Sequence, residues 1–121
     1  MTSFEKKTFI MDIDGTICTN TFGEYVNAVP FYDRIEAINK LHKMGHSIIY
    51  FTARGMGRTN NDAKEASRRF FDFTFDQLVS WGCFFDSLRL GKPAGSYYID
   101  DKAMTDIDFF EHFIKEHIDG K

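Results

Sequence analysis

The sequence is short of cysteine and of net positive charge, and each shortage excludes a class of protein. Cys18 and Cys83 are its two cysteines, too few for the disulfide framework of a small secreted domain. The formal net charge is -3, so no basic field favours a polyanion. We therefore expect no nucleic-acid partner.

Export and membrane segments are lacking as well. The first residues, MTSFEKKTF, contain no apolar stretch of the kind found in a secretory signal. The longest apolar stretches are far too short to span a bilayer. With its few cysteines, the chain is expected to be a cytoplasmic protein without a membrane partner.

The sequence does contain the composition and the alternating pattern of an α/β domain. Hydrophobic residues make up 43% and charged residues 27% of 121 residues, which is ordinary for one globular domain. Stretches typical of strands alternate with stretches typical of helices, as in a parallel sheet covered on both faces. We predict a single domain over residues 1–121, a Rossmann-like three-layer sandwich around a central parallel sheet.

The predicted elements follow from the two hydrophobic periods. Strands are predicted at residues 8–11, 46–51, 83–88 and 96–99. Helices are predicted at residues 32–44, at 60–81 in two pieces broken near 72–74, and at 105–118. Residues 19–30 fit neither period, so we expect a loop or small hairpin over the sheet edge.

Polar residues follow all four predicted strands at their carboxyl ends. These ends line one crevice in an open parallel sheet, so residues far apart in sequence are expected to meet there. They are Asp12, Asp14, Gly15 and Thr16 after the first strand, Thr52 and Arg54 after the second, Gly91 and Lys92 after the third, and Asp100 and Asp101 after the fourth.

The four aspartates of this crevice would repel one another without a cation among them, and some of their pKa values would rise. Lys92 supplies one positive charge. Oxygen ligands without matching histidines or thiolates suit a hard ion that keeps several waters and takes one or two carboxylates. The sequence therefore predicts a Mg²⁺ site suited to phosphoryl transfer.

Four motifs, in this order, resemble the signature elements of the haloacid dehalogenase (HAD) superfamily. They are DIDGT at 12–16, FTAR with Thr52, GKP with Lys92, and IDD at 99–101, and they cover essentially the whole chain. FTARGMG, GKPAG and YIDDKA are also similar to small capless HAD proteins associated with bacterial capsule or surface-polysaccharide synthesis. The resemblance implies a HAD-like fold, and residues 17–45 and 54–91 leave little room for a cap domain.

The resemblance implies four catalytic residues. Asp12 would be the nucleophile that forms an aspartyl-phosphate, and Asp14 the general acid and then the general base. In extended backbone, residues i and i+2 face the same way, so both carboxylates can address one phosphoryl group. Thr52 and Lys92 would stabilise the charge that develops on that group.

The resemblance also implies a metal set. Mg²⁺ would be held by the Asp12 carboxylate, the Asp14 backbone carbonyl and Asp101, with Asp100 orienting Lys92 or a metal water. Asp106 would hold a further metal water, although a helix N-cap or a first-turn acid explains it at least as well.

Substrate contacts are expected from residues beside the catalytic ones. Gly15, Thr16, Ala53 and Arg54 form this predicted set, in which Gly15 lets the chain turn and nearby amides hold phosphate oxygens. For Arg54, binding a substrate phosphate and capping its own loop are equally good interpretations.

The expected function is that of a Mg²⁺-dependent phosphatase for a small phosphomonoester, a sugar phosphate if the polysaccharide resemblance holds. One alternative is a phosphatase acting on a macromolecular end, a polynucleotide or a phosphoprotein. Another is a non-enzymatic signalling module with a phosphorylated aspartate, but such receivers place their acidic pair first, whereas here DxD comes first and the pair last. Because a capless site is open, a neighbouring subunit that closes it, and hence a homo-oligomer, remains a hypothesis.

Overall fold

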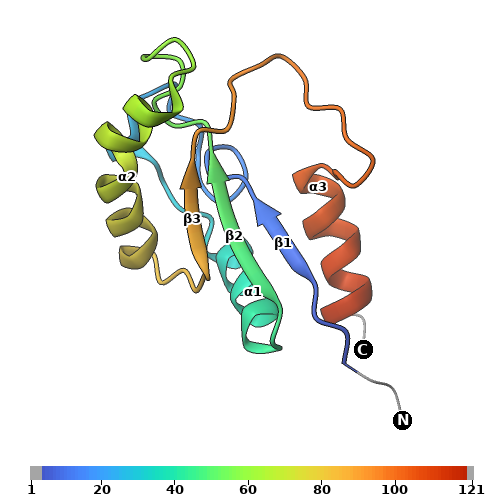
Figure 1. The fold of residues 1–121 in the computed structure, drawn as a ribbon. Coiled ribbons are helices and arrows are strands. Elements are labelled where there is room, and N and C mark those ends of the chain that lie inside the picture. The colour runs from blue at the N-terminus through green and yellow to red at the C-terminus, as the bar shows by residue number, and fades with distance from the viewer. Residues whose placement is uncertain (1–3, 120–121) are drawn as a thin grey trace.

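The computed structural model describes residues 4–119 and shows a small α/β domain with three parallel strands flanked by helices (Figure 1). The strands β1 (Thr8–Met11), β2 (Ser47–Thr52) and β3 (Ser87–Leu90) lie in the order β1-β2-β3. Met11 lies opposite Tyr50, and Tyr50 lies opposite Leu88. The predicted parallel α/β arrangement is therefore confirmed, with the first two strands close to their predicted limits.

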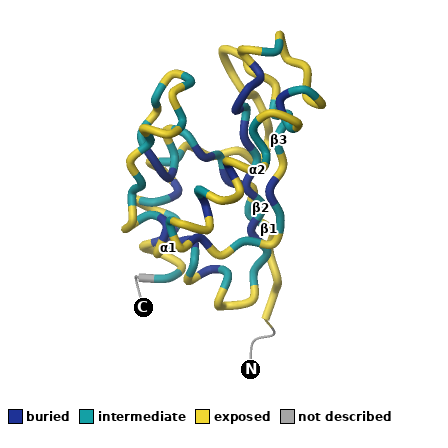
Figure 2. The backbone as a smooth tube through the Cα atoms, turned by 90° about the vertical axis from the view of Figure 1, so that its left-hand side faces the viewer, coloured by how far each residue is buried: buried dark blue, intermediate teal, exposed yellow. Residues whose placement is uncertain are grey.

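The fourth predicted strand is not formed in the part of the chain that the structure describes. Residues 93–105 are exposed throughout (Figure 2), and the Ile99 side chain, predicted to lie in a strand, is 96% exposed. This segment arches from the end of β3 to the far side of β1 (Figure 1). It pairs with no strand edge, and a few of its backbone groups bond side chains instead, as the Ala94 amide does with Asn61 Oδ1 at 3.0 Å. The prediction of a strand at residues 96–99 is wrong.

The third strand begins later than predicted because residues 83–86 form an irregular connection after the preceding helix. The Cys83 amide donates to the Leu78 carbonyl at 3.0 Å and so closes the preceding helix. Asp86 accepts from the Ile48 amide at 2.7 Å through its carboxylate and donates its own amide to the Ile48 carbonyl. Asp86 therefore ties this connection to β2, and the ladder begins at Ser87.

The first helix, α1 (Tyr32–Lys43), agrees with the prediction. It buries Ile35, Ile38 and Leu41 at helical spacing. Gly45 follows it with a backbone φ of +104°, a value that residues with a side chain rarely adopt. The His46 amide donates back to the Leu41 carbonyl. The chain thereby reverses directly into β2.

The second helix, α2 (Ala63–Ser80), is one piece, so the predicted break near residues 72–74 is wrong. Asp62 caps its start by accepting from the Glu65 amide at 3.1 Å, an interaction worth about 1 kcal/mol. Thr74, a poor helix former, is completely buried and hydrogen-bonded through its hydroxyl. These tertiary contacts outweigh its low helix propensity.

The last of the described residues form a helical segment, as predicted for residues 105–118. α3 (Asp106–Asp108) continues into η2 (Phe109–Phe113) and η3 (Lys115–Asp119), which have the wider π geometry. Thr105 caps its start by accepting from the Asp108 amide at 3.1 Å. A short 3-10 helix, η1 (Tyr25–Asn27), lies in the predicted loop at 19–30.

The core lies on one face of the sheet. Met11 and Ile48 share it with side chains from α1, α2 and the C-terminal helical segment. On the opposite face, Ile10 is 64% exposed. α1 connects β1 to β2, and α2 connects β2 to β3, so both connections step in the same direction along the sheet. Right-handed connections of this kind put their helices on the same face. The predicted second helical layer is therefore not seen among residues 4–119, and none of the helices there combines the length and apolarity needed to cross a membrane.

Candidate active site

A cavity of about 350 Å³ lies at the carboxyl ends of β1 and β2. Six of the predicted site residues line it: Asp12, Asp14, Thr52, Ala53, Arg54 and Lys92. A larger cavity of about 650 Å³ lies between α2 and β3, but aromatic and aliphatic side chains dominate its wall. Titratable groups converge in the smaller cavity, which is the candidate site.

Asp12 is the first residue after β1, and its side chain is 37% exposed. Burial raises the pKa of its carboxyl above the ordinary value, and the nearby Lys92 ammonium partly offsets that rise. Lys92 Nζ lies 3.8 Å from Asp12 Oδ1. The site therefore holds a partly desolvated carboxylate beside one cation.

Lys92 is held in place by a hydrogen bond from its backbone amide and by a contact between its ammonium group and an aromatic ring. Its amide donates to the Thr52 carbonyl at 3.2 Å, and its ammonium lies 4.4 Å from the centre of the Tyr98 ring. The Tyr98 hydroxyl donates to the Pro93 carbonyl, which fixes that ring. Burial, and then the charge of Asp12, raise the pKa of Tyr98.

Thr52 is the last residue of β2 and is buried. Its Oγ1 accepts from the Arg54 amide at 3.1 Å. Because that bond uses the oxygen as an acceptor, the hydroxyl hydrogen can still be donated to a ligand in the cavity.

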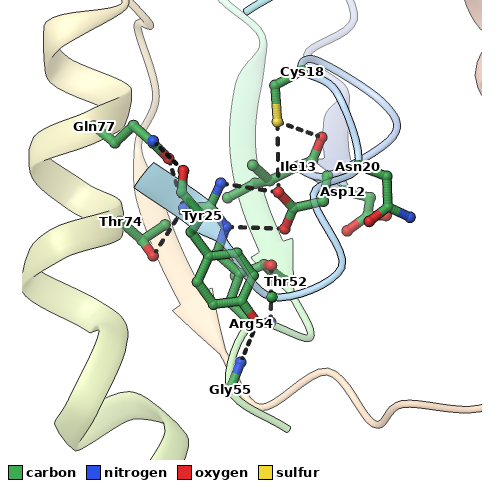
Figure 3. A network of polar contacts seen from close by, with 12 residues as sticks. Asp12, Ile13, Cys18, Asn20, Tyr25, Thr52, Arg54, Gly55, Thr74 and Gln77 are labelled. Carbon is green, nitrogen blue, oxygen red and sulfur yellow. Dashed lines mark hydrogen bonds and ion pairs between the residues drawn. The ribbon is translucent and has the colours of Figure 1, made fainter. Parts of the chain in front are cut away.

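Asp14 and Arg54 form a bidentate ion pair, of which Arg54 is labelled in Figure 3. Arg54 Nε donates to Asp14 Oδ2 at 2.9 Å, and Nη2 donates to Oδ1 at 3.0 Å. Nη1 donates to Gln77 Oε1 at 2.7 Å and to Thr74 Oγ1 at 3.3 Å. The Arg54 side chain is completely buried. The structure thus places it against Asp14 and α2, and its role toward a substrate phosphate stays a prediction.

The loop at residues 19–30 folds over this ion pair as a flap. The Tyr25 ring lies 4.7 Å from the Arg54 guanidinium carbon, and the Tyr25 hydroxyl accepts from the Gly55 amide at 2.9 Å. Arg58 donates to the Gly23 carbonyl at 2.7 Å. Asn20, Gly23 and Tyr25 line the cavity, so the flap forms one of its walls.

Gly15 and Thr16 turn the chain between the site and the flap, and they lie beside the lining of the cavity rather than in it. Gly15 has a φ of +82° and donates its amide to the Cys18 carbonyl, while Thr16 donates to the Ile13 carbonyl. Both amides serve this turn, so phosphate binding by them stays a prediction.

The structure does not bring Asp100 and Asp101 to the cavity. Both lie in the exposed segment after Lys92, because the strand that would carry them inward is not formed. The Lys102 amide, which donates to Asp100 at 2.9 Å, lowers the pKa of that carboxyl.

Asp106 occupies the first turn of α3 and forms an ion pair with Arg34 at 2.8 Å. Arg34 also donates to the Thr16 carbonyl at 3.0 Å. Asp106 therefore reaches the turn after β1 only through Arg34, and a metal water on it stays a prediction.

A Mg²⁺ ion fits the donors present at the cavity. The described residues contain no group of three acidic, cysteine or histidine side chains placed to hold a metal. Mg²⁺ in phosphoryl-transfer sites takes one or two carboxylates, waters and substrate oxygens, which Asp12 and the chain beside it can supply. Hard oxygen donors next to a partly desolvated carboxylate suit this ion.

Reasoning from the sequence missed Asn20 and Tyr98 in the lining of the cavity, and it also missed two residues behind Arg54. Thr74 and Gln77 anchor Arg54 from α2. The sequence does contain a sign of this role: Thr74 and Gln77 are polar residues on the same side of the predicted helix as Ala66 and Leu78, which are buried. A polar side chain on such a stripe needs a buried partner.

Comparison with known proteins informs the fold. A scan against models of protein families and a search of curated proteins find no match. A crystal structure of a target protein from Vibrio cholerae is similar, with a TM-score of 0.80 and 26% identity over 94% of this chain and 92% of that one. Its description names no activity, so the likeness shows a shared α/β architecture across nearly the whole chain.

Proposed function

We propose that this chain is a Mg²⁺-dependent phosphatase of the HAD type, which hydrolyses a small phosphomonoester through an aspartyl-phosphate intermediate. One observation carries the proposal: Asp12, Asp14, Thr52 and Lys92, which come from three strand ends, line a single cavity. A nucleophile, a proton carrier, a hydroxyl donor and a cation are the groups that phosphoryl transfer needs.

In the first step the phosphoryl group passes to Asp12. A carboxylate oxygen of Asp12 forms a bond to phosphorus while the bond to the leaving oxygen breaks. Asp14, which takes up a proton from solvent before this step, gives it to that oxygen, so the substrate leaves as an alcohol. Lys92 and the Thr52 hydroxyl stabilise the charge on the transferring oxygens.

In the second step water releases the phosphate. Asp14, now ionised, takes a proton from the attacking water as its oxygen bonds to phosphorus. The bond from phosphorus to Asp12 breaks, and inorganic phosphate leaves. Both residues return to their starting states, so the cycle is balanced.

A bound Mg²⁺ would neutralise charge on the phosphoryl oxygens. Asp12 and the Asp14 carbonyl would hold it, and Asp101 would join them if the segment after Lys92 folds inward. This last contact belongs to the proposal, because Asp101 is exposed in the structure.

The dimensions of the cavity support a small substrate. About 350 Å³ lies at the lower end of the range for small-molecule sites. Asn20 and Tyr98, which also line it, offer an amide and a phenolic oxygen to a polyol; the Tyr98 oxygen acts as an acceptor, because its hydrogen is donated to Pro93. A sugar phosphate combines such hydroxyls with a phosphomonoester.

A panel of sugar phosphates, nucleotides and phosphopeptides, assayed with Mg²⁺ and with EDTA, tests the proposal. We expect turnover of at least one sugar phosphate, lost in EDTA and restored by Mg²⁺. Asp12→Asn should lower kcat by about 10⁴-fold or more, whereas Asp72→Asn, at an exposed position on α2, should not. Activity of Asp12→Asn near that of the wild type would refute the assignment.

A further inference from the structure

We propose that Arg54 is the positioning residue for Asp14: it holds that carboxylate from inside the protein so that Asp14 can protonate the leaving group. This inference rests on the proposed function, and it gives Arg54 a different task from the substrate contact expected from the sequence. Arg54 acts through Asp14 and does not touch the phosphoryl group.

The geometry of the pair leaves Asp14 little freedom. Two parallel N–H bonds, at 2.9 and 3.0 Å, join the planar guanidinium to both carboxylate oxygens. Such a fork fixes the rotation of the carboxylate as well as its position. The Cys18 thiol lies 3.6 Å from Oδ1, which leaves Oδ2 as the oxygen with fewer contacts.

The burial of Arg54 keeps it from the substrate. Its side chain is 0% exposed, while that of Asp14 is 18% exposed. Four of its N–H bonds already have protein acceptors, two on Asp14 and one each on Thr74 and Gln77. Of the two side chains, only that of Asp14 is exposed to the cavity.

Helix α2 and the flap fix Arg54 from behind. Gln77 accepts from Arg54 Nη1 at 2.7 Å through Oε1, and its Nε2 donates to the Tyr25 carbonyl at 2.8 Å. The Tyr25 ring covers the guanidinium at 4.7 Å. The Gln77 amide thus joins Arg54 to the flap. Figure 3 shows Gln77 and Tyr25 next to Arg54, on the side away from Asp12.

The consequence concerns one step of the reaction. Attack by Asp12 does not use Asp14, but departure of a poor leaving group does. A mispositioned Asp14 should therefore cost most with substrates whose leaving oxygen needs a proton. An arginine that binds the phosphate would affect all phosphomonoesters equally, which separates the two roles.

The test compares kcat/KM for phenyl phosphate and p-nitrophenyl phosphate. The two probes are similar in size and form the same phosphoenzyme, and kcat/KM contains only the steps up to release of the leaving group. p-Nitrophenolate leaves without a proton, whereas phenolate needs one. In Arg54→Lys, which keeps the charge and loses the fork, we expect kcat/KM for phenyl phosphate to fall at least about tenfold more than for p-nitrophenyl phosphate.

Companion variants make the outcome specific. Asp14→Asn should show the same selective loss, and adding Arg54→Lys to it should cost little more, since both act on one step. Arg58→Lys, which contacts the same Tyr25 ring without touching Asp14, should leave the ratio of the two kcat/KM values unchanged. If Arg54→Lys does not fold, Gln77→Met should still lower kcat/KM more for phenyl phosphate than for p-nitrophenyl phosphate, by a smaller factor.

Equal losses on both probes, or no loss, in folded Arg54→Lys would overturn the positioning role while leaving the phosphatase proposal intact. A wild-type protein that hydrolyses neither probe nor any phosphomonoester of the panel would overturn both. A selective loss in Arg54→Lys and Asp14→Asn, absent from Arg58→Lys, is the result that supports the inference.

Discussion

Lys92 and Asp12 meet across an intervening strand: Lys92 Nζ lies 3.8 Å from Asp12 Oδ1, although β2 separates the strands that precede them. The Lys92 amide donates to the carbonyl of Thr52 at the end of β2, so the chain after β3 bends over that strand toward β1. Three successive strand ends are thereby joined at one cavity.

This contact predicts the effect of removing the ammonium. Lys92→Met should lower kcat/KM on an aryl phosphate by about 10²–10³-fold, because one donor to the developing charge is lost. It should also raise the pKa of Asp12 further in metal-free protein, since Lys92 partly offsets the effect of burial. Steady-state kinetics and carboxyl NMR measure the two effects.

Lys64→Met, at an exposed position in α2, is the matched control and should change neither quantity. An unchanged kcat/KM in Lys92→Met would exclude Lys92 from the stabilisation of the transferring group.

Asp12 predicts a dependence of stability on pH in the absence of metal. Burial raises the pKa of Asp12 in the folded state, so the folded protein holds this proton more tightly than the unfolded chain does. The stabilisation is complete below the ordinary aspartate pKa and is lost as the pH rises through the raised pKa. At neutral pH the buried carboxylate is therefore destabilising.

Asp12→Asn should accordingly have a higher Tm than the wild type in EDTA at pH 7, and the gain should shrink as the pH falls toward the ordinary aspartate pKa. Mg²⁺ should raise the Tm of the wild type more than that of the variant. Thermal unfolding followed by circular dichroism checks both. A variant less stable than the wild type at pH 7 would contradict the account of Asp12.

Local patterns sufficed for much of the fold. The apolar run SIIYF predicts β2, and the apolar spacing of residues 35, 38 and 41 predicts α1, because each element carries its own hydrophobic period. The cavity residues could be predicted because the carboxyl ends of parallel strands lie at one edge of the sheet.

Local patterns fail where distant contacts decide. The sequence predicts a break near residues 72–74, yet α2 is continuous there and Thr74 accepts a hydrogen bond from Arg54. Residues 96–99 have the composition of a strand, but a strand needs a partner edge, and here Tyr97 and Ile99 stay exposed. The orientation of Arg54 depends on Gln77, which lies more than twenty positions away in sequence.

Asp101 lies in the exposed segment after Lys92, so a substitution there tests whether Asp101 is a Mg²⁺ ligand. If Asp101 joins Asp12 in holding Mg²⁺, Asp101→Asn should raise the Mg²⁺ concentration for half-maximal activity by about tenfold or more. Titration of activity with Mg²⁺ measures it, with Asp108→Asn, an exposed acid in α3, as the control. An unchanged Mg²⁺ requirement would remove Asp101 from the metal set and leave it where the structure places it.

Trapping the covalent intermediate tests the central claim most directly. Wild-type protein should be mixed with Mg²⁺ and a hydrolysed phosphomonoester, quenched in acid within milliseconds, digested and analysed by mass spectrometry. We predict one phosphoryl group on the peptide that contains Asp12, absent from Asp12→Asn and more abundant in Asp14→Asn, where hydrolysis of the intermediate is slowed. Turnover with no phosphoryl group on Asp12 in either the wild type or Asp14→Asn would contradict the account.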